Sequence, residues 1–166
     1  MTWSSMSDAD PRETAAQYFQ KGYERQQAGE YREAIELYTR SIETFPTAEA
    51  YTFRGWAYSF LNDYERAIAE CLKAIKVDPE FGNPYNDIGA YLIEQGQWVE
   101  AVPWFKKAMK AARYEARCYP YFNLGRVYEH NRQWQEAKEC YAQAYALDHR
   151  YLTALAGIRR LRAMFN

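Results

Sequence analysis

The chain has 166 residues, of which 48% are hydrophobic and 26% are charged, and its formal net charge is −1. A chain of this length buries roughly 68 to 70% of the surface that it exposes when unfolded, so it needs no disulfide or metal to fold, and intrinsic disorder is excluded. Because 21 basic residues stand against 22 acidic ones, the composition also argues against a general binder of nucleic acid or of anionic membranes.

The cysteines and the start of the chain bear on the compartment. Cys71, Cys118 and Cys140 are odd in number and form no CxxC pair, which favours a reducing environment over a disulfide framework. Residues 1–14 are polar and lack the cationic start and apolar stretch of a signal peptide. No apolar run approaches the roughly 20 residues of a membrane span. We therefore expect a cytoplasmic protein with no membrane insertion.

Four glycines mark an internal repeat. Gly22, Gly55, Gly89 and Gly125 are separated by 33, 34 and 36 residues. A tyrosine stands four residues before each glycine, an aromatic residue nine after and an alanine twelve after. Intervals of three and four residues return to one helical face, so each repeat predicts two packed helices, with small residues where they cross.

The repeats divide the chain in order. A polar segment at 1–14 precedes repeats at 15–47, 48–81, 82–117 and 118–151, and an amphipathic capping helix at 152–166 follows, all within one structural domain. Gly29 and Gly96 suit the left-handed conformation that ends a helix, and Asn62 does the same in the second repeat. Pro84 and Pro120 are typical of the first turn of a helix.

This spacing of glycine, alanine, aromatic residues and a closing proline resembles the tetratricopeptide repeat, whose period is 34 residues. The resemblance covers about 15–151 and implies an all-α, right-handed superhelix of helix-turn-helix repeats whose concave groove binds extended peptides. Arg113 and His149 replace the closing proline in the last two repeats. Two extra residues before Cys118 predict a longer second helix or a looser loop in repeat three.

Candidate binding residues are found by subtraction. The tyrosine, the glycine and their neighbours occupy the buried side of the first helix of each repeat, and the opposite side would line the groove. Aromatic residues are frequent on that opposite side: Phe19, Tyr23, Trp56, Phe60, Tyr119 and Phe122. Exposed rings in a cleft indicate a contact surface.

The polar residues of the same side suggest how a peptide would be held. The amides of Asn83 and Asn86 can donate and accept together with a peptide backbone, and Arg126 can hold an acidic group. Three glutamates elsewhere on the side favour a neutral or basic ligand with apolar side chains. Members of the family that bind the acidic tails of heat-shock chaperones use a clamp of Lys and Asn; Phe19 and Tyr23 stand there instead, which disfavours that role.

Catalysis finds little support in the sequence. His130 and His149 are the only histidines, and neither forms a metal-ligating motif with Cys140. The glycines fit no phosphate-binding loop. We expect no catalytic residue, metal or cofactor.

The leading hypothesis is a non-enzymatic scaffold or adaptor that binds a protein or peptide. One alternative is a small secretion-type chaperone that holds an apolar unfolded segment. A second is self-assembly, in which an uncovered repeat edge or the groove takes an arm such as Trp3 to Met6 of another copy. We interpret the cationic run of the third repeat as a solvated convex face of its second helix, not as a nucleic-acid site: Lys106, Lys107, Lys110 and Arg113.

Overall fold

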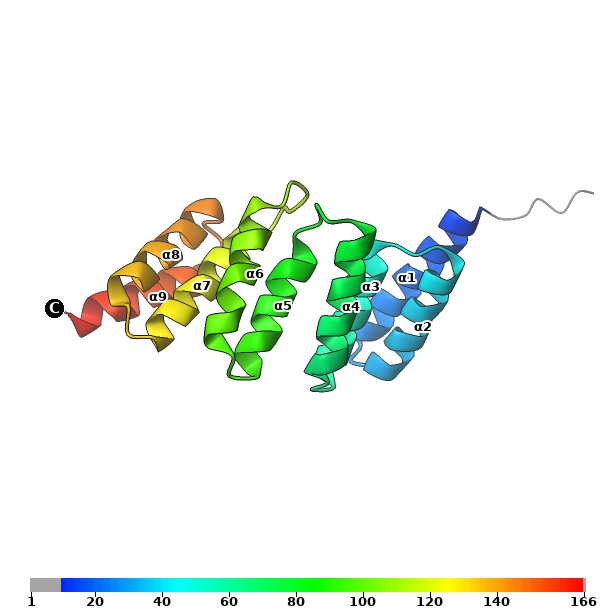
Figure 1. The fold of residues 1–166 in the computed structure, drawn as a ribbon, viewed down its shortest axis with the longest axis horizontal. Coiled ribbons are helices and arrows are strands. Elements are labelled where there is room, and N and C mark those ends of the chain that lie inside the picture. Colours follow the sequence, from blue (N-terminus) through cyan, green and yellow to red (C-terminus); the bar gives the residue numbers. More distant parts are fainter. Residues whose placement is uncertain (1–9, 166) are drawn as a thin grey trace, which may run out of the picture. The chain divides into compact units, whose positions relative to one another are not determined.

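The computed structural model describes residues 10–165, and in that range the prediction of an all-α fold is confirmed (Figure 1). The nine helices of the described range are α1 (Pro11–Gln27), α2 (Tyr31–Thr44), α3 (Ala48–Phe60), α4 (Tyr64–Val77), α5 (Asn83–Glu94), α6 (Trp98–Lys110), α7 (Cys118–His130), α8 (Trp134–Leu147) and α9 (Leu152–Met164). Most of the predicted segment at 1–14, including Trp3 to Met6, lies outside the described residues. The first helix begins at Pro11, ahead of the predicted start of the first repeat.

The helices form two compact units, an N-terminal unit that ends at Val77 and a C-terminal unit that begins at Asp78. In the N-terminal unit, α1 packs on α2 and α3 packs on α4, and α3 also contacts both α1 and α2. In the C-terminal unit, α5 pairs with α6 and α7 with α8, α7 contacts both helices of the preceding pair, and α9 packs on α8. Each pair overlaps one of the ranges predicted for the repeats.

Close contacts between glycines and rings join the helices. A Cβ atom at Gly125 of α7 would lie only 2.6 Å from the ring of Tyr141, which is itself almost fully buried. Gly157 of α9 approaches the other edge of that ring, where its Cβ would lie 2.8 Å away. The capping helix packs on the second helix of the pair before it, as α3 packs on α2 and α7 packs on α6. The 32-residue step from Gly125 to Gly157 is the sequence signal that marks it.

The turns follow the predicted conformations. Gly29 and Gly96 have φ angles of 80° and 78°, and Asn62 has a φ of 59°. Arg132 takes the same left-handed conformation in the fourth repeat, with a φ of 59°, although nothing in its residue type predicts it. Pro84 lies in the first turn of α5, as expected.

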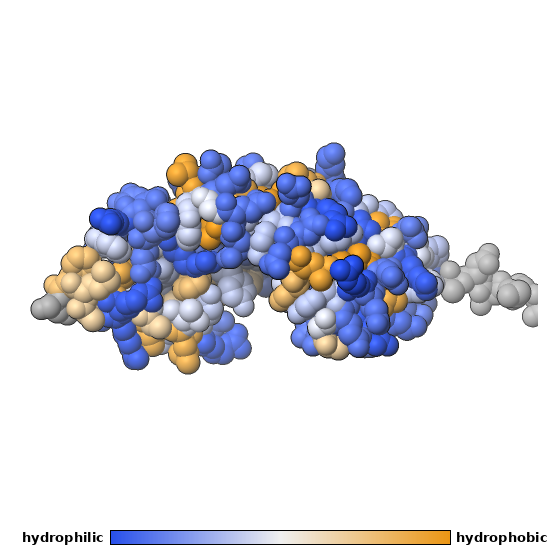
Figure 2. All heavy atoms as spheres, turned by 90° about the horizontal axis from the view of Figure 1, so that it is seen from below, coloured by the Kyte–Doolittle hydropathy of each residue, from blue (hydrophilic) through white to orange (hydrophobic). Residues whose placement is uncertain are grey.

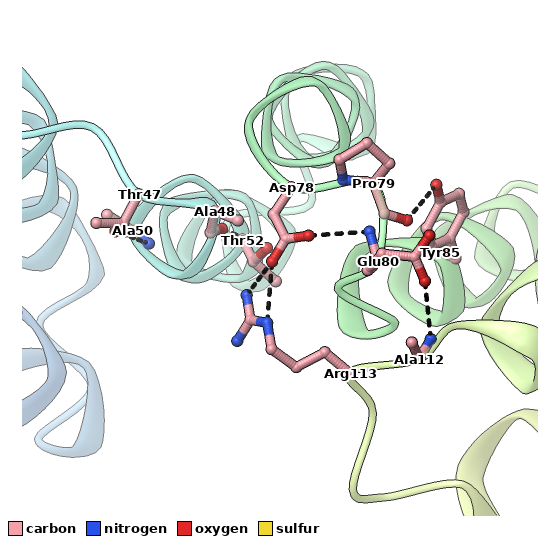
Figure 3. A network of polar contacts seen from close by, with 10 residues as sticks. All are labelled: Thr47, Ala48, Ala50, Thr52, Asp78, Pro79, Glu80, Tyr85, Ala112 and Arg113. Carbon is pink, nitrogen blue, oxygen red and sulfur yellow. Dashed lines mark hydrogen bonds and ion pairs between the residues drawn. The ribbon is translucent and has the colours of Figure 1, made fainter.

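The extra residues of the third repeat lie in a loop. The helix α6 ends at Lys110, and residues 111–117 lead to α7. The prediction that Arg113 lies on the second helix of the third repeat is wrong, because α6 ends at Lys110 and Arg113 lies in this loop. Its guanidinium donates two hydrogen bonds to Asp78, at 2.6 and 2.9 Å (Figure 3). The backbone of Arg113 also pairs with Glu80 and Gly82. The loop is thereby fastened to the segment that precedes α5.

The surfaces of the helices carry two further features. Lys106, Lys107 and Lys110 are exposed on α6, and Pro103 lies inside that helix. In the described range, no helix combines the length and the apolar character that a membrane crossing requires.

Candidate functional site

Five aromatic residues of α1 and α3 form a continuous cluster in the N-terminal unit, here called the ring face: Phe19, Tyr23, Phe53, Trp56 and Phe60. Phe53 is at its centre, with ring centroids 5.1 Å from Phe19, 5.9 Å from Tyr23 and 5.6 Å from Trp56. Interplanar angles of 68° to 75° make these edge-to-face contacts, which hold each ring in a defined orientation.

The members of the ring face differ in exposure. Tyr23 and Trp56 are each 37% exposed and Phe60 is 46% exposed. Phe19 is half-buried, because it packs with Phe53 against the core that α2 contributes. Three of the four predicted rings of this unit thus present surface to solvent.

The edge of the ring face is extended by a residue outside the predicted set. Tyr31, the first residue of α2, stacks on Phe60 with a centroid distance of 4.5 Å and an interplanar angle of 4°. Tyr31 is the aromatic residue nine positions after Gly22 in the repeat pattern, and Phe53 is not among the predicted groove rings, so neither was expected here. The signal for Phe53 is its position three residues before Trp56, about one helical turn away on the same helix.

A buried polar network fixes α3 beneath the ring face. Arg54 donates to Glu70 at 2.6 Å and 2.8 Å and to the hydroxyl of Thr39 at 2.9 Å, and Lys73 also pairs with Glu70. The side chains of Arg54 and Glu70 are only 12% and 6% exposed. The network links α2, α3 and α4, so the backbone that carries Trp56 is held on two sides.

In the C-terminal unit, the predicted amides occupy different environments. Asn83 is the first residue of α5 and is half-buried. Asn86 is 8% exposed, and its side-chain oxygen accepts a hydrogen bond of 3.1 Å from Asn123 of α7. The structure thus turns Asn86 into the protein, away from the exposed position expected for it.

The two predicted rings of this unit lie on α7. Tyr119 is exposed and makes an edge-to-face contact with Tyr151. Phe122 is half-buried between Tyr141 and Tyr151, with centroid distances of 5.3 and 5.1 Å. Phe122 therefore belongs as much to the core as to the surface.

Arg126 and Glu129 stand one turn apart on α7, and they have different partners. Glu129 accepts hydrogen bonds from Arg160 of α9, the shortest at 2.7 Å, and one of 2.6 Å from the hydroxyl of Tyr141. Burial alone would raise the pKa of Glu129, but the bonds from Arg160 and Tyr141 outweigh it and lower that pKa. Glu129 is therefore ionised at neutral pH.

A second carboxyl on α5 behaves in the opposite way. Although Asp87 keeps part of its surface exposed, desolvation raises the pKa of its carboxyl to about 7, and the hydrogen bond from Asn86 only partly opposes this. The buried hydroxyl of Tyr114 lies near enough to feel the charge of Asp87. Asp87 is therefore only partly ionised near neutral pH.

The differences in exposure have one cause. Phe19, Asn86 and Phe122 each stand three residues before the repeat glycine, and each contacts the helix that follows in the stack: Phe19 meets α3, Asn86 meets α7, and Phe122 packs against the core that includes α9. The periodicity of one helix does not show this coverage. Residues one and five positions after the glycine, such as Trp56 and Phe60, stay open.

The surface around these features is mostly polar. On the face drawn in Figure 2, hydrophobic residues form separate patches within a largely hydrophilic surface, and one patch lies at the end of α9. Among the described residues there is no cluster of three or more side chains that could hold a metal ion.

The geometry defines a helical-hairpin repeat protein, and comparison with known families places it further. Residues 16–47 and 48–81 each match a family model described as tetratricopeptide repeat, and residues 80–150 match a second model with the same description. The chain belongs to the tetratricopeptide repeat family, as its sequence pattern predicts.

Two relatives illustrate the level of similarity. The chain is 33% identical over 97 residues to small glutamine-rich tetratricopeptide repeat-containing protein 2 of Mycosarcoma maydis, covering 58% of this chain and 28% of the relative. It is 32% identical over 99 residues to heat shock protein STI1 of Saccharomyces cerevisiae, covering 58% and 17%. The chain thus matches less than a third of the length of either relative.

Solved structures share the fold. The structure of PilF from Pseudomonas aeruginosa aligns with a TM-score of 0.85 at 23% identity, over 92% of this chain and 69% of the other. The structure of MamA aligns with a TM-score of 0.70 at 20% identity, over 90% and 81%. At these identities, the likeness concerns the fold alone.

Proposed function

We propose that the protein is a non-enzymatic protein-interaction module that binds a segment of a partner on the ring face of its N-terminal unit. The observation that carries this proposal is the exposure of Tyr23, Trp56 and Phe60 on two helices, α1 and α3, that both pack on α2. Large rings at the centre of a binding patch contribute much of the affinity of protein interfaces. Membership of a family of repeat scaffolds supports the same class of function.

The ligand that fits the ring face carries apolar side chains and is neutral or basic. The N-terminal unit has 9 basic and 12 acidic residues, so its net charge is −3. In the described residues, six cations already lie over other rings, such as Arg66 over Tyr58, and none of the six covers a member of the ring face. A lysine or arginine of the ligand can use these free ring faces.

The predicted residues of the C-terminal unit have secondary roles in this proposal. Asn83 and Tyr119 offer accessible contacts, whereas Asn86 and Phe122 position α7 from within. The cysteines Cys71, Cys118 and Cys140 form no disulfide within the described residues, which fits a reducing compartment such as the cytoplasm.

The test is selection of twelve-residue peptides displayed on phage against the wild-type protein, followed by calorimetric affinities of the selected peptides. We expect Trp56→Ala to weaken binding at least about tenfold, since a buried aromatic anchor is worth about 2 kcal/mol or more. The matched control is Leu72→Ala, which removes an exposed apolar side chain of the same unit from α4. Equal affinities for wild type and Trp56→Ala, with both folded alike, would contradict the proposal.

A further inference from the structure

A second concave site lies in the C-terminal unit, between α7 and α9. It is a cavity of about 450 Å³, a size typical of small-ligand pockets. We call it the arginine pocket, and its lining residues are Trp98, Phe122, Arg126, Glu129, His130, Tyr141, Thr153, Ala156 and Arg160. All of them belong to one unit, so the pocket is complete without any other part of the chain.

The negative charge in this pocket is already neutralised. Both carboxylate oxygens of Glu129 accept hydrogen bonds from Arg160, and one of them also accepts from Tyr141. Little of the carboxylate is left to attract a cation. Glu129 therefore serves to hold Arg160 against α7.

Arg126 is the cation that is held least tightly. Its side chain is 35% exposed, and its contacts are long: 3.4 Å to the side-chain oxygen of Asn123 and 3.6 Å to Glu94. The side chain of Glu94 is itself half exposed, which makes it a weak competitor in water. The planar guanidinium has five N–H donors, so most remain available for a ligand.

The remaining walls are flat and largely apolar. Trp98 and His130 stack with a centroid distance of 4.1 Å and an interplanar angle of 8°. Phe122 contributes a half-buried ring on the same helix as Arg126. Such walls fit a small apolar group beside a charged one.

We propose that the arginine pocket binds a carboxylate that stands next to an apolar side chain, with Arg126 as the direct partner of the carboxylate. The ligand sources that share this chemistry are the C-terminus of a polypeptide and an acidic side chain within one. The C-terminal unit has 12 basic and 10 acidic residues, so its net charge of +2 favours the approach of an anion. The inference extends the proposed interaction function to a second ligand chemistry, at a site separate from the ring face.

The test uses three small probes and ¹⁵N-labelled full-length protein. N-acetyl-phenylalanine carries a free carboxylate, its amide is the neutral twin, and N-acetyl-phenylalanyl-glutamic acid amide carries the acid on a side chain. The indole N–H signal of Trp98 reports on the arginine pocket, and that of Trp56 reports on the ring face. We expect N-acetyl-phenylalanine to shift the Trp98 signal with a dissociation constant of about 1 mM, as suits so small a ligand.

The variants isolate the role of Arg126. Arg126→Gln should weaken binding of N-acetyl-phenylalanine at least about tenfold, and Glu94→Gln should strengthen it about twofold by removing the competitor. Arg159→Gln, which removes an exposed arginine of α9 outside the pocket lining, should leave the dissociation constant unchanged. Melting temperatures of all variants show that they fold.

Each outcome bears on the inference. Equal binding of the acid and its neutral amide, or equal losses in Arg126→Gln and Arg159→Gln, would overturn it. The stronger of the two acidic probes identifies the source of the carboxylate. A failure here leaves the Trp56 signal and the ring face untouched, so it is distinguishable from failure of the interaction function.

Discussion

The two units build the same repeat but present different chemistry. The N-terminal unit is net acidic and exposes rings, whereas the C-terminal unit is net basic and exposes a guanidinium group beside a stacked indole and imidazole. One position that differs between the units is four residues after the repeat glycine. There, Gln26 accepts a hydrogen bond from Tyr38 at 2.9 Å, and Glu129 accepts one from Tyr141 at 2.6 Å.

The change from an amide to a carboxylate at one position brings other charges with it. Gln26 is neutral and almost fully buried, and its hydrogen-bond partner is the hydroxyl of Tyr38, which carries no charge. Glu129 needs Arg160, which stands 31 residues away on α9. The carboxylate at this position is thus paired with a cation, as a partly buried carboxylate without a partner is costly.

The largest effect should come from the buried ion pair of the N-terminal unit. Glu70→Ala leaves the guanidinium of Arg54 buried with only Thr39 as a polar partner, so we expect unfolding to become easier by about 3 kcal/mol. Urea denaturation followed by circular dichroism measures this. Arg160→Ala removes a half-exposed partner in the C-terminal unit and should cost about 1 kcal/mol. Equal losses would show that burial does not distinguish the two pairs.

A reciprocal substitution sharpens the comparison at the Gln26 position. Gln26→Glu places a carboxylate beside the hydroxyl of Tyr38, which donates to Gln26 in the wild type. Among the hydrogen bonds of the described residues, no arginine pairs with this position as Arg160 pairs with Glu129. We expect a loss of about 2 kcal/mol at pH 7, which should diminish as the pH falls and the new carboxyl becomes protonated. Denaturation midpoints at pH 4.5 and 7 provide the measurement. A variant as stable as wild type at pH 7 would contradict the role assigned to Arg160.

The next effect concerns the pH dependence of the C-terminal unit. Because the pKa of Asp87 is raised to about 7 in the fold from 3.8, the folded state binds an extra proton between these values. Its contribution to stability is therefore full below pH 3.8 and is lost as the pH rises toward 7. The loss should be on the order of 1 to 2 kcal/mol, because Asp87 keeps some contact with solvent.

The variant that tests this is Asp87→Asn. This variant should be more stable than wild type at pH 8, and its free energy of unfolding should change less between pH 4 and 7. The control is Glu94→Gln, which removes an exposed carboxyl at the end of the same helix. It should change neither the stability at pH 8 nor the pH dependence of stability. Parallel curves of stability against pH for wild type and Asp87→Asn would show that Asp87 does not cause the pH dependence.

The smallest effect should come from the ion pair between Asp78 and Arg113, which fastens the loop before α7. The pKa of Asp78 is lowered by the hydrogen bonds from Arg113, so the ion pair stabilises the fold above pH 3.8 and loses that contribution as the pH falls through the folded pKa. Asp78→Asn should cost less than about 1 kcal/mol at pH 7, because the pair is partly exposed. Hydrogen exchange of the amide of Arg113, which bonds to the carbonyl of Glu80, should quicken in this variant. Unchanged exchange would show that the backbone pairing holds the loop without the ion pair.

The amino-acid sequence by itself determined the repeat, the turns and the capping helix. These features depend on short-range chemistry: a missing Cβ at Gly29 and Gly96, a fixed φ at Pro84, and rings and alanines spaced by one helical turn. The same local rules located Tyr23, Trp56 and Phe60 on the open side of their helices.

Only the tertiary structure decided which parts of that side stay open. Phe19 and Asn86 are covered because the next helix packs on them, and Arg160 reaches Glu129 because α9 folds back beside α7. A periodic pattern gives the direction of a side chain around its own helix axis, but burial and ion pairing depend on neighbours that are distant in sequence. The division into two units, and the pocket between α7 and α9, follow from those long-range contacts.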